Sequence, residues 1–152
     1  MKYVTAALAC LLAMPSFAAA PSALNAAGTQ ALVAAPAKGV RLLALWSLDC
    51  AYCEENLSAL AAFQRSHEDV ELVFVATDPI SESPALEARL KAAGLDAVPS
   101  RAYADATPER INFLIDPTWG GETPRTLAIK ADGTREAVSG ALDAGRIAKL
   151  VD

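Results

Sequence analysis

The chain has 152 residues, of which 53% are hydrophobic and 20% are charged, and its formal net charge is −5. These values are typical of one compact domain with a hydrophobic core. The sequence contains no internal repeat and no cluster of basic residues, which argues against nucleic acid as a partner.

The first 18 residues are typical of a secretory signal. One early cation, Lys2, precedes an apolar run that ends at Pro15, and small residues follow in the tripeptide at 16–18. The run is too short for the roughly 20 apolar residues that a membrane-spanning helix needs. We therefore expect residues 1–18 to be a cleaved signal peptide, the protein to be periplasmic, and the mature chain to have no stable membrane insertion.

Residues 19–39 are rich in alanine and lead into the main domain. Their low complexity predicts little regular structure, apart from a short edge strand near Gln30–Val33. From Val40 to Asp152 the apolar pattern becomes regular, and we expect one α/β domain over residues 40–152.

The first half of that domain predicts alternating strands and helices. Two nearly continuous apolar runs, Val40–Ser47 and Val70–Ala76, have the length and composition of strands that are buried on both faces. Apolar residues at helical spacing predict helices over Ala51–Ser66 and Pro84–Ala93. The order is therefore β-α-β-α.

The second half is less regular. We expect a short strand at Ser100–Tyr103 and a helix at Pro108–Ile115, although the letters INFLI in that range also allow a strand. An Asp-Gly turn predicts a hairpin between two apolar segments. The remaining predicted elements are the hairpin strands Thr126–Lys130 and Thr134–Ser139 and a last helix at Asp143–Val151.

The pair Cys50-Ala51-Tyr52-Cys53 follows the first predicted strand and stands at the start of the first predicted helix. A structural zinc site wants four ligands, and the chain after the signal offers only His67 besides the two cysteines. A c-type haem needs histidine where Glu54 stands. A structural disulfide across so small a loop stabilises little. Redox use of the pair is the interpretation that remains.

This order of elements resembles the thioredoxin superfamily, and in particular the exported TlpA/ResA-like thiol-disulfide oxidoreductases. The likeness covers Lys38 to Asp152 and depends on Trp46 before the cysteines, on the CxxC itself, and on the segment TPRTLAIKADG. It implies a thioredoxin-like α/β fold with a central mixed β-sheet flanked by helices.

The expected chemistry is dithiol/disulfide exchange with protein clients, without metal or other cofactor. At a helix N-terminus, free N–H groups and the dipole stabilise a Cys50 thiolate, which makes Cys50 the nucleophile. Cys53, one turn further and facing the core, is the resolving thiol. Three carboxylates near Cys50 in the sequence, and no nearby cation, favour a reductant that an upstream thiol donor recharges: Asp49, Glu54 and Glu55.

The resemblance also implies a cis peptide bond before Pro124, which would place Thr123 against the cysteines to pair with a client strand. Without the resemblance, the sequence alone would predict an ordinary trans proline at the start of a strand, which is the common case. We expect the client surface to contain Thr123, Pro124, Trp46 and Tyr52. Trp119 is interpreted mainly as a packing residue, with a place in the client groove as the alternative, and Arg125 as a surface residue beside the groove.

The sequence departs from the TlpA/ResA-like pattern at several places. Asn56 stands where a glutamate is usual, Ser58 where a helix-kinking proline is usual, and Ala44 where thioredoxins bury an acid beneath the cysteines. Two other functions therefore stay open: a redox-inert module that holds an extended peptide, and a protein that handles Cu(I) through the reduced pair.

Overall fold

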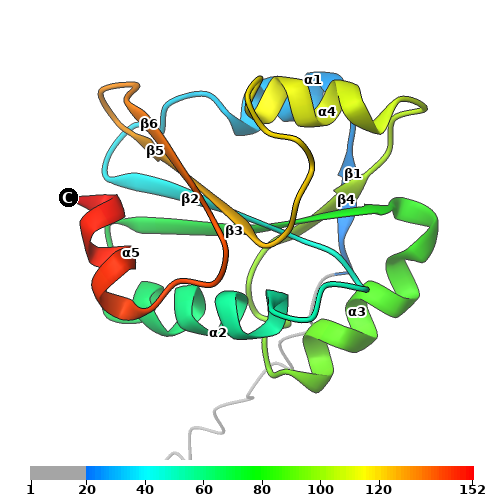
Figure 1. Cartoon of the computed structure of the whole chain (residues 1–152), viewed down its shortest axis with the longest axis horizontal. Helices are drawn as coiled ribbons and strands as arrows, with labels where there is room; N and C mark the ends of the chain where they lie inside the picture. Colours follow the sequence, from blue (N-terminus) through cyan, green and yellow to red (C-terminus); the bar gives the residue numbers. More distant parts are fainter. Residues whose placement is uncertain (1–19) are drawn as a thin grey trace, which may run out of the picture.

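The computed structural model describes residues 20–152, and these contain one mixed sheet (Figure 1). Its six strands lie in the order β1-β4-β3-β2-β5-β6. The strands β1, β4, β3 and β2 are parallel to one another, whereas β5 is antiparallel to β2 and β6 is antiparallel to β5. The strands are β1 Ser22–Leu24, β2 Val40–Trp46, β3 Val70–Pro79, β4 Ser100–Tyr103, β5 Arg125–Lys130 and β6 Arg135–Ser139. The predicted central mixed sheet is confirmed.

Helices cover both faces of the sheet. Figure 1 shows α1 and α4 on one face and α2, α3 and α5 on the other. The helices are α1 Ala26–Leu32, α2 Cys53–Gln64, α3 Ser83–Ala92, α4 Pro108–Ile115 and α5 Ala144–Val151. This arrangement is the α/β architecture expected from the sequence, with a buried sheet between two helical layers.

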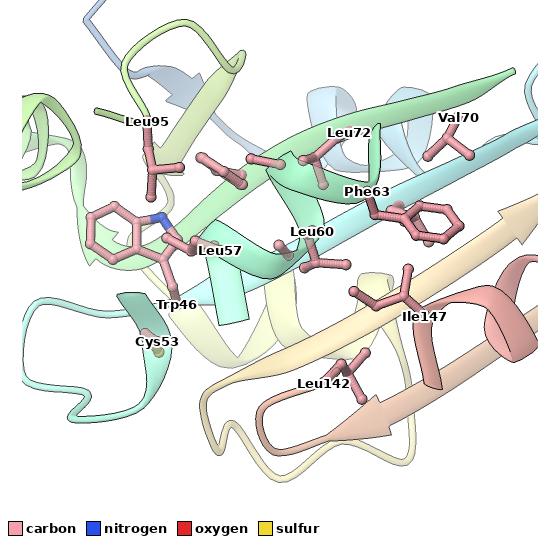
Figure 2. Close-up of a cluster of buried hydrophobic side chains, with 14 of the residues drawn as sticks. Trp46, Cys53, Leu57, Leu60, Phe63, Val70, Leu72, Leu95, Leu142 and Ile147 are labelled. Atoms are coloured by element: carbon pink, nitrogen blue, oxygen red, sulfur yellow. The ribbon is translucent and has the colours of Figure 1, made fainter. Parts of the chain in front are cut away.

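The sheet separates two hydrophobic cores, one on each face. Strand β2 contributes to both cores, because successive side chains of a strand point to opposite faces. Leu42, Ala44 and Trp46 join the core beneath α2, α3 and α5. Leu43 and Leu45 join the core beneath α1 and α4. Figure 2 shows the first core, with Trp46 and Cys53 at one end of it. The continuous apolar run in the sequence thus reflects a strand that is covered on both sides.

Most predicted elements are present with shifted ends. Strand β3 continues to Pro79, and helix α2 begins at Cys53 instead of Ala51. The segment INFLI is helical, because α4 buries Ile111 and Ile115, four residues apart, on the same face. The strand alternative for that segment is therefore wrong.

The predicted edge strand at Gln30–Val33 is wrong as well. Most of those residues belong to α1, whose N-cap Asn25 accepts a hydrogen bond from the Gly28 N–H at 2.9 Å. Alanine-rich sequence favours a helix once its end is capped. The edge strand is instead β1, which pairs with β4 in parallel. Residues 20–39 thus contribute a strand and a helix to the domain.

The predicted signal peptide, residues 1–18, lies outside the residues that the structure describes. Between residues 20 and 152, no helix combines the length and the apolar character needed to cross a membrane.

Candidate active site

The two cysteines form a disulfide between the end of β2 and the start of α2. The bond length is 2.05 Å and the two Cα atoms lie 5.5 Å apart. Cys53 is 1% exposed and belongs to the core, whereas Cys50 is partly exposed at the rim of that core. The two cysteines therefore differ in exposure to solvent, and only Cys50 can meet a large partner directly.

Backbone turns bring Cys50 to the N-terminal end of α2. The Cys50 N–H donates to the Ser47 carbonyl at 3.3 Å, and the Cys53 N–H donates to the Cys50 carbonyl at 3.5 Å. Cys50 thus precedes the helix in a turn, and Cys53 is the first helical residue. Because the positive end of the helix dipole lies at this point, negative charge on a reduced Cys50 is stabilised.

A second loop meets the cysteine loop. The peptide bond between Thr123 and Pro124 is cis, as the resemblance implied, and Pro124 is buried. The Thr123 and Ser47 hydroxyl oxygens lie 3.2 Å apart, and Ser47 donates its own hydrogen to Asp49 Oδ1 at 2.8 Å. A serine hydroxyl has one hydrogen, so Thr123 is the donor to Ser47. A chain of two hydroxyls therefore joins the proline loop to the residue before Cys50.

The two aromatic residues of the predicted client surface differ in exposure. Trp46 is 2% exposed, and it lines a small cavity beside both cysteines. Tyr52 is 67% exposed, one residue before Cys53. Tyr52 is thus accessible to a partner, whereas Trp46 supports the disulfide from beneath.

Asp78 is an acid at this site that sequence reasoning did not single out. Its Oδ2 accepts a hydrogen bond from the Leu48 N–H at 3.0 Å. Burial raises the pKa of the Asp78 carboxyl, the hydrogen bond from Leu48 opposes that rise, and the charges of Asp49 and Glu82 add to it. Its position in the sequence, near the end of the predicted strand β3, could have identified it. Parallel strands β2 and β3 have their C-terminal ends at the same edge of the sheet.

Arg89 is a cation at the site, although no cation is near Cys50 in the sequence. It projects from α3, and its Nη2 donates a long hydrogen bond of 3.5 Å to the Leu48 carbonyl. It also lines the cavity that Cys50, Cys53 and Glu54 line. Only the packing of α3 beside α2 creates this proximity.

Asn56 connects α2 to two other segments beneath the cysteines. It is fully buried, its Nδ2 donates to Thr126 Oγ1 at 3.2 Å, and its Oδ1 accepts from the Leu142 N–H at 3.0 Å. Ala44, at the position where an acid is usual in thioredoxins, is 0% exposed in the same core. An amide thus satisfies the buried polar groups here without carrying charge.

The interpretation of Arg125 as a surface residue is wrong. Its side chain is 13% exposed and pairs with Asp116 at 2.5 Å and with Glu122 at 3.2 Å. It also donates to Ser139 Oγ at 2.7 Å. Since Glu122 directly precedes Thr123, this network holds the proline loop against β5 instead of facing a client.

The packing interpretation of Trp119 agrees with the structure. Trp119 is 6% exposed in the core beneath α1 and α4, on the face of the sheet opposite to Trp46. Its Nε1 donates to the Glu122 carbonyl at 2.8 Å, which adds a second anchor to the proline loop.

Metal chemistry has no preformed centre in the described part of the chain. Within residues 20–152, no group of three or more histidine, cysteine, aspartate or glutamate side chains is arranged to hold a metal ion.

The chain was compared with family models, curated proteins and solved structures. No family model matches the sequence, and no curated protein matches it. Solved structures do match. A thioredoxin-related protein from Neisseria meningitidis serogroup B aligns with a TM-score of 0.60 and 19% identity, over 75% of this chain and 83% of that one. The chain has a thioredoxin-like fold.

Two further structures share this thioredoxin-like fold. A secreted disulfide oxidoreductase of Mycobacterium tuberculosis, described as homologous to E. coli DsbE, aligns with a TM-score of 0.58 and 20% identity, over 74% of this chain and 82% of that one. StoA from Bacillus subtilis aligns with a TM-score of 0.58 and 22% identity, over 77% of this chain and 86% of that one. The predicted thioredoxin-like fold is therefore confirmed.

Proposed function

We propose that this protein is a thiol-disulfide oxidoreductase that exchanges electrons with protein clients through Cys50 and Cys53. The observation that carries the proposal is the disulfide at the N-terminus of α2, in which Cys50 is partly exposed and Cys53 is buried in the core. A disulfide with only a structural role has no need of this asymmetry. A two-step exchange does need it, because the attacking thiol must be reachable and the resolving thiol must be protected.

The reaction begins with the reduced pair. The Cys50 thiolate attacks one sulfur of a client disulfide, a bond forms between Cys50 and the client, and the other client sulfur leaves as a thiolate. Cys53 then loses its proton and attacks the Cys50 sulfur. The Cys50–Cys53 disulfide forms, and the second client sulfur leaves as a thiolate. Two electrons pass from the cysteine pair to the client, and both client sulfurs end as thiols once protonated.

The client surface proposed here consists of the exposed Tyr52 and the loop at Thr123 and Pro124, with Trp46, which is 2% exposed, packed behind the disulfide as its support. The contact between the Thr123 and Ser47 hydroxyls supports it, because it brings the proline loop to the cysteine loop. Tyr52 supplies exposed apolar area next to the disulfide. Backbone groups at Thr123 are then available to pair with an extended client segment, as in other cases of strand addition.

The direction proposed is reduction of clients by an exported protein that an upstream thiol donor recharges. The exposed carboxylates of Asp49, Glu54 and Glu55 around Cys50 support it, because negative charge disfavours the thiolate and thus the reduced form. Export to the periplasm rests on the N-terminal residues 1–18, and the structurally similar protein of Mycobacterium tuberculosis is described as secreted.

Trapping the mixed disulfide tests the exchange. Cys53→Ser should accumulate a covalent complex with a disulfide-containing protein such as insulin, and adding dithiothreitol should release it. Cys50→Ser, the matched control, should trap nothing. Turnover of insulin at the wild-type rate by either variant would contradict the proposal.

Alkylation of the reduced wild-type protein provides a second test. A maleimide at neutral pH should label Cys50 before Cys53, because Cys53 is buried. Peptide mapping identifies the labelled residue, and preferential labelling of Cys53 would reverse the assignment of the two roles.

A further inference from the structure

Arg89 is the cation whose position the sequence did not anticipate. It precedes Leu90, which is buried in the core, and its own side chain is exposed. Its guanidinium turns back toward the cysteine loop, where it donates to the Leu48 carbonyl at 3.5 Å. Leu48 lies two residues before Cys50, so the charge stands at the base of the turn that carries the nucleophile.

A small cavity beside the disulfide places the charge of Arg89 near both cysteines. Arg89 lines it together with both cysteines, and the remaining wall is mostly apolar, formed by Leu57, Leu90, Ala93 and Leu95. Charges that interact across a wall of low polarisability are screened less than charges that interact through water. The indole N–H of Trp46 also borders this cavity and has no hydrogen-bond partner among the described residues, and Figure 2 shows its nitrogen on the side toward Leu95.

The other charges at the site are negative. Glu54 lines the same cavity, Asp49 and Glu55 are exposed nearby, and Asp78 holds the Leu48 N–H from β3. Glu82, before α3, acts on Asp78. Arg89 is therefore the cationic side chain, among the described residues that line the cavity, that opposes these carboxylates.

We propose that Arg89 is a positioning residue that lowers the pKa of the Cys50 thiol by holding the Leu48–Cys50 turn and facing the thiolate across the cavity. This inference rests on the proposed function, because it assumes that Cys50 is the nucleophile. Stabilising the thiolate stabilises the reduced pair and makes the couple more oxidising. Arg89 thus limits the reducing character that the surrounding carboxylates impose.

The test is a charge deletion with a matched control on the same helix. Arg89→Gln and Lys91→Gln each remove one positive charge from exposed positions of α3, but Lys91 does not line the cavity. In a Cys53→Ser background only Cys50 titrates among the active-site cysteines. Ultraviolet absorbance of the thiolate against pH then gives the pKa of Cys50, and the rate of alkylation at neutral pH gives its reactivity.

Arg89→Gln should raise the pKa of Cys50 and slow its alkylation by about three- to tenfold. Lys91→Gln should leave both unchanged, and Arg89→Lys should restore most of the wild-type values. Because the guanidinium is exposed, the difference between wild type and Arg89→Gln should shrink at high salt, which a purely structural role would not produce.

The outcomes separate this inference from the proposed function. One result is a normal Cys50 thiolate transition whose pKa is the same in Arg89→Gln as in the wild type, and another is a pKa that shifts equally in Arg89→Gln and Lys91→Gln. Either result overturns the role of Arg89 alone. Absence of any Cys50 thiolate transition in the protein with Arg89 intact, together with failure of Cys53→Ser to trap insulin, overturns both.

Discussion

Ser47 and Thr123, 76 residues apart in the sequence, lie with their hydroxyl oxygens 3.2 Å from each other. Ser47 passes the interaction on to Asp49, directly before Cys50. The proline loop and the cysteine loop are therefore joined by side chains. In the proposed function, a client that pairs with the backbone at Thr123 would contact the same hydrogen-bonded chain, which ends at Asp49 beside Cys50.

Removing either hydroxyl should weaken this connection. Ser47→Ala and Thr123→Val should each lower the free energy of unfolding by about 0.5–1.5 kcal/mol and reduce insulin trapping by the Cys53→Ser protein. The double variant should lose less than the sum of the two, because the bond is shared. Denaturant titration of the four proteins measures the coupling. Fully additive losses would show that the two hydroxyls do not interact in solution.

Asn56→Ala should strongly destabilise the fold. The change leaves the Leu142 N–H and the Thr126 hydroxyl without their partner, and each buried group left unpaired costs about 1–3 kcal/mol. Ser58→Ala, an exposed position on the same helix, should cost little and serves as the control. Chemical denaturation measures both. A loss for Asn56→Ala as small as that for Ser58→Ala would mean that water replaces the amide.

The Arg125 network should make stability depend on acidity. Burial raises the pKa of Asp116, but hydrogen bonds from Arg125 and Thr118 outweigh it and hold the pKa below the ordinary 3.8. A hydrogen bond from Ser139, assisted by the charge of Arg125, holds the pKa of Glu122 below the ordinary 4.5. Both groups have depressed pKa values in the folded state.

The sign of the effect follows from these directions. A carboxyl with a depressed pKa contributes its stability above the pKa of the unfolded chain and loses it as pH falls through the folded pKa. We expect the free energy of unfolding to fall below about pH 4, and to fall less steeply in Asp116→Asn. Thermal unfolding from pH 7 to pH 2 checks this expectation. Identical slopes for the two proteins would remove Asp116 from the explanation.

Asp49→Asn should raise the reduction potential of the cysteine pair, which makes the pair a stronger oxidant. Removing the carboxylate beside Cys50 lowers the pKa of its thiol and stabilises the reduced form, and each roughly 30 mV corresponds to about 1.4 kcal/mol. Glu109→Gln deletes the same charge from an exposed position of α4, beyond the other face of the sheet, and should have no effect. Redox titration against glutathione measures both. No response to Asp49→Asn would show that local charge does not govern the potential.

Tyr52 should matter for clients and little for stability. Its side chain is 67% exposed, so Tyr52→Ala should leave the melting temperature near that of the wild type and slow insulin reduction. Phe113→Ala provides a matched control, since Phe113 is 63% exposed on α4, away from the disulfide. Steady-state kinetics should place the Tyr52 effect mainly in KM. Equal rates for the two variants would argue against Tyr52 as part of the client surface.

Local patterns in the sequence were sufficient for most of the fold. The nearly continuous apolar run at Val40–Ser47 predicted a strand buried on both faces, and β2 buries every side chain of Val40–Trp46 except that of Arg41. The turn at Asp132-Gly133 follows from local chemistry too, whereas α2 begins at Cys53, two residues after its predicted start at Ala51. The helix α1 was missed, since alanine-rich sequence carries little periodic signal and its Asn25 cap was not recognised.

The sequence also determined the central pair of the site. A spacing of two residues between Cys50 and Cys53 places their Cα atoms 5.5 Å apart at a helix start, which suits a disulfide without movement of the rest of the chain. That relationship is local, so it could be predicted from a short stretch of sequence.

The electrostatic surroundings of that pair were decided by the tertiary structure. Asp78 reaches Leu48 because two parallel strands end at one edge of the sheet, and Arg89 reaches it because α3 packs beside α2. Arg125 pairs with Asp116 and Glu122 because the proline loop lies against β5 in the folded protein. Charge interactions depend on distance in space and on the medium between the groups, and neither can be obtained from separation along the chain.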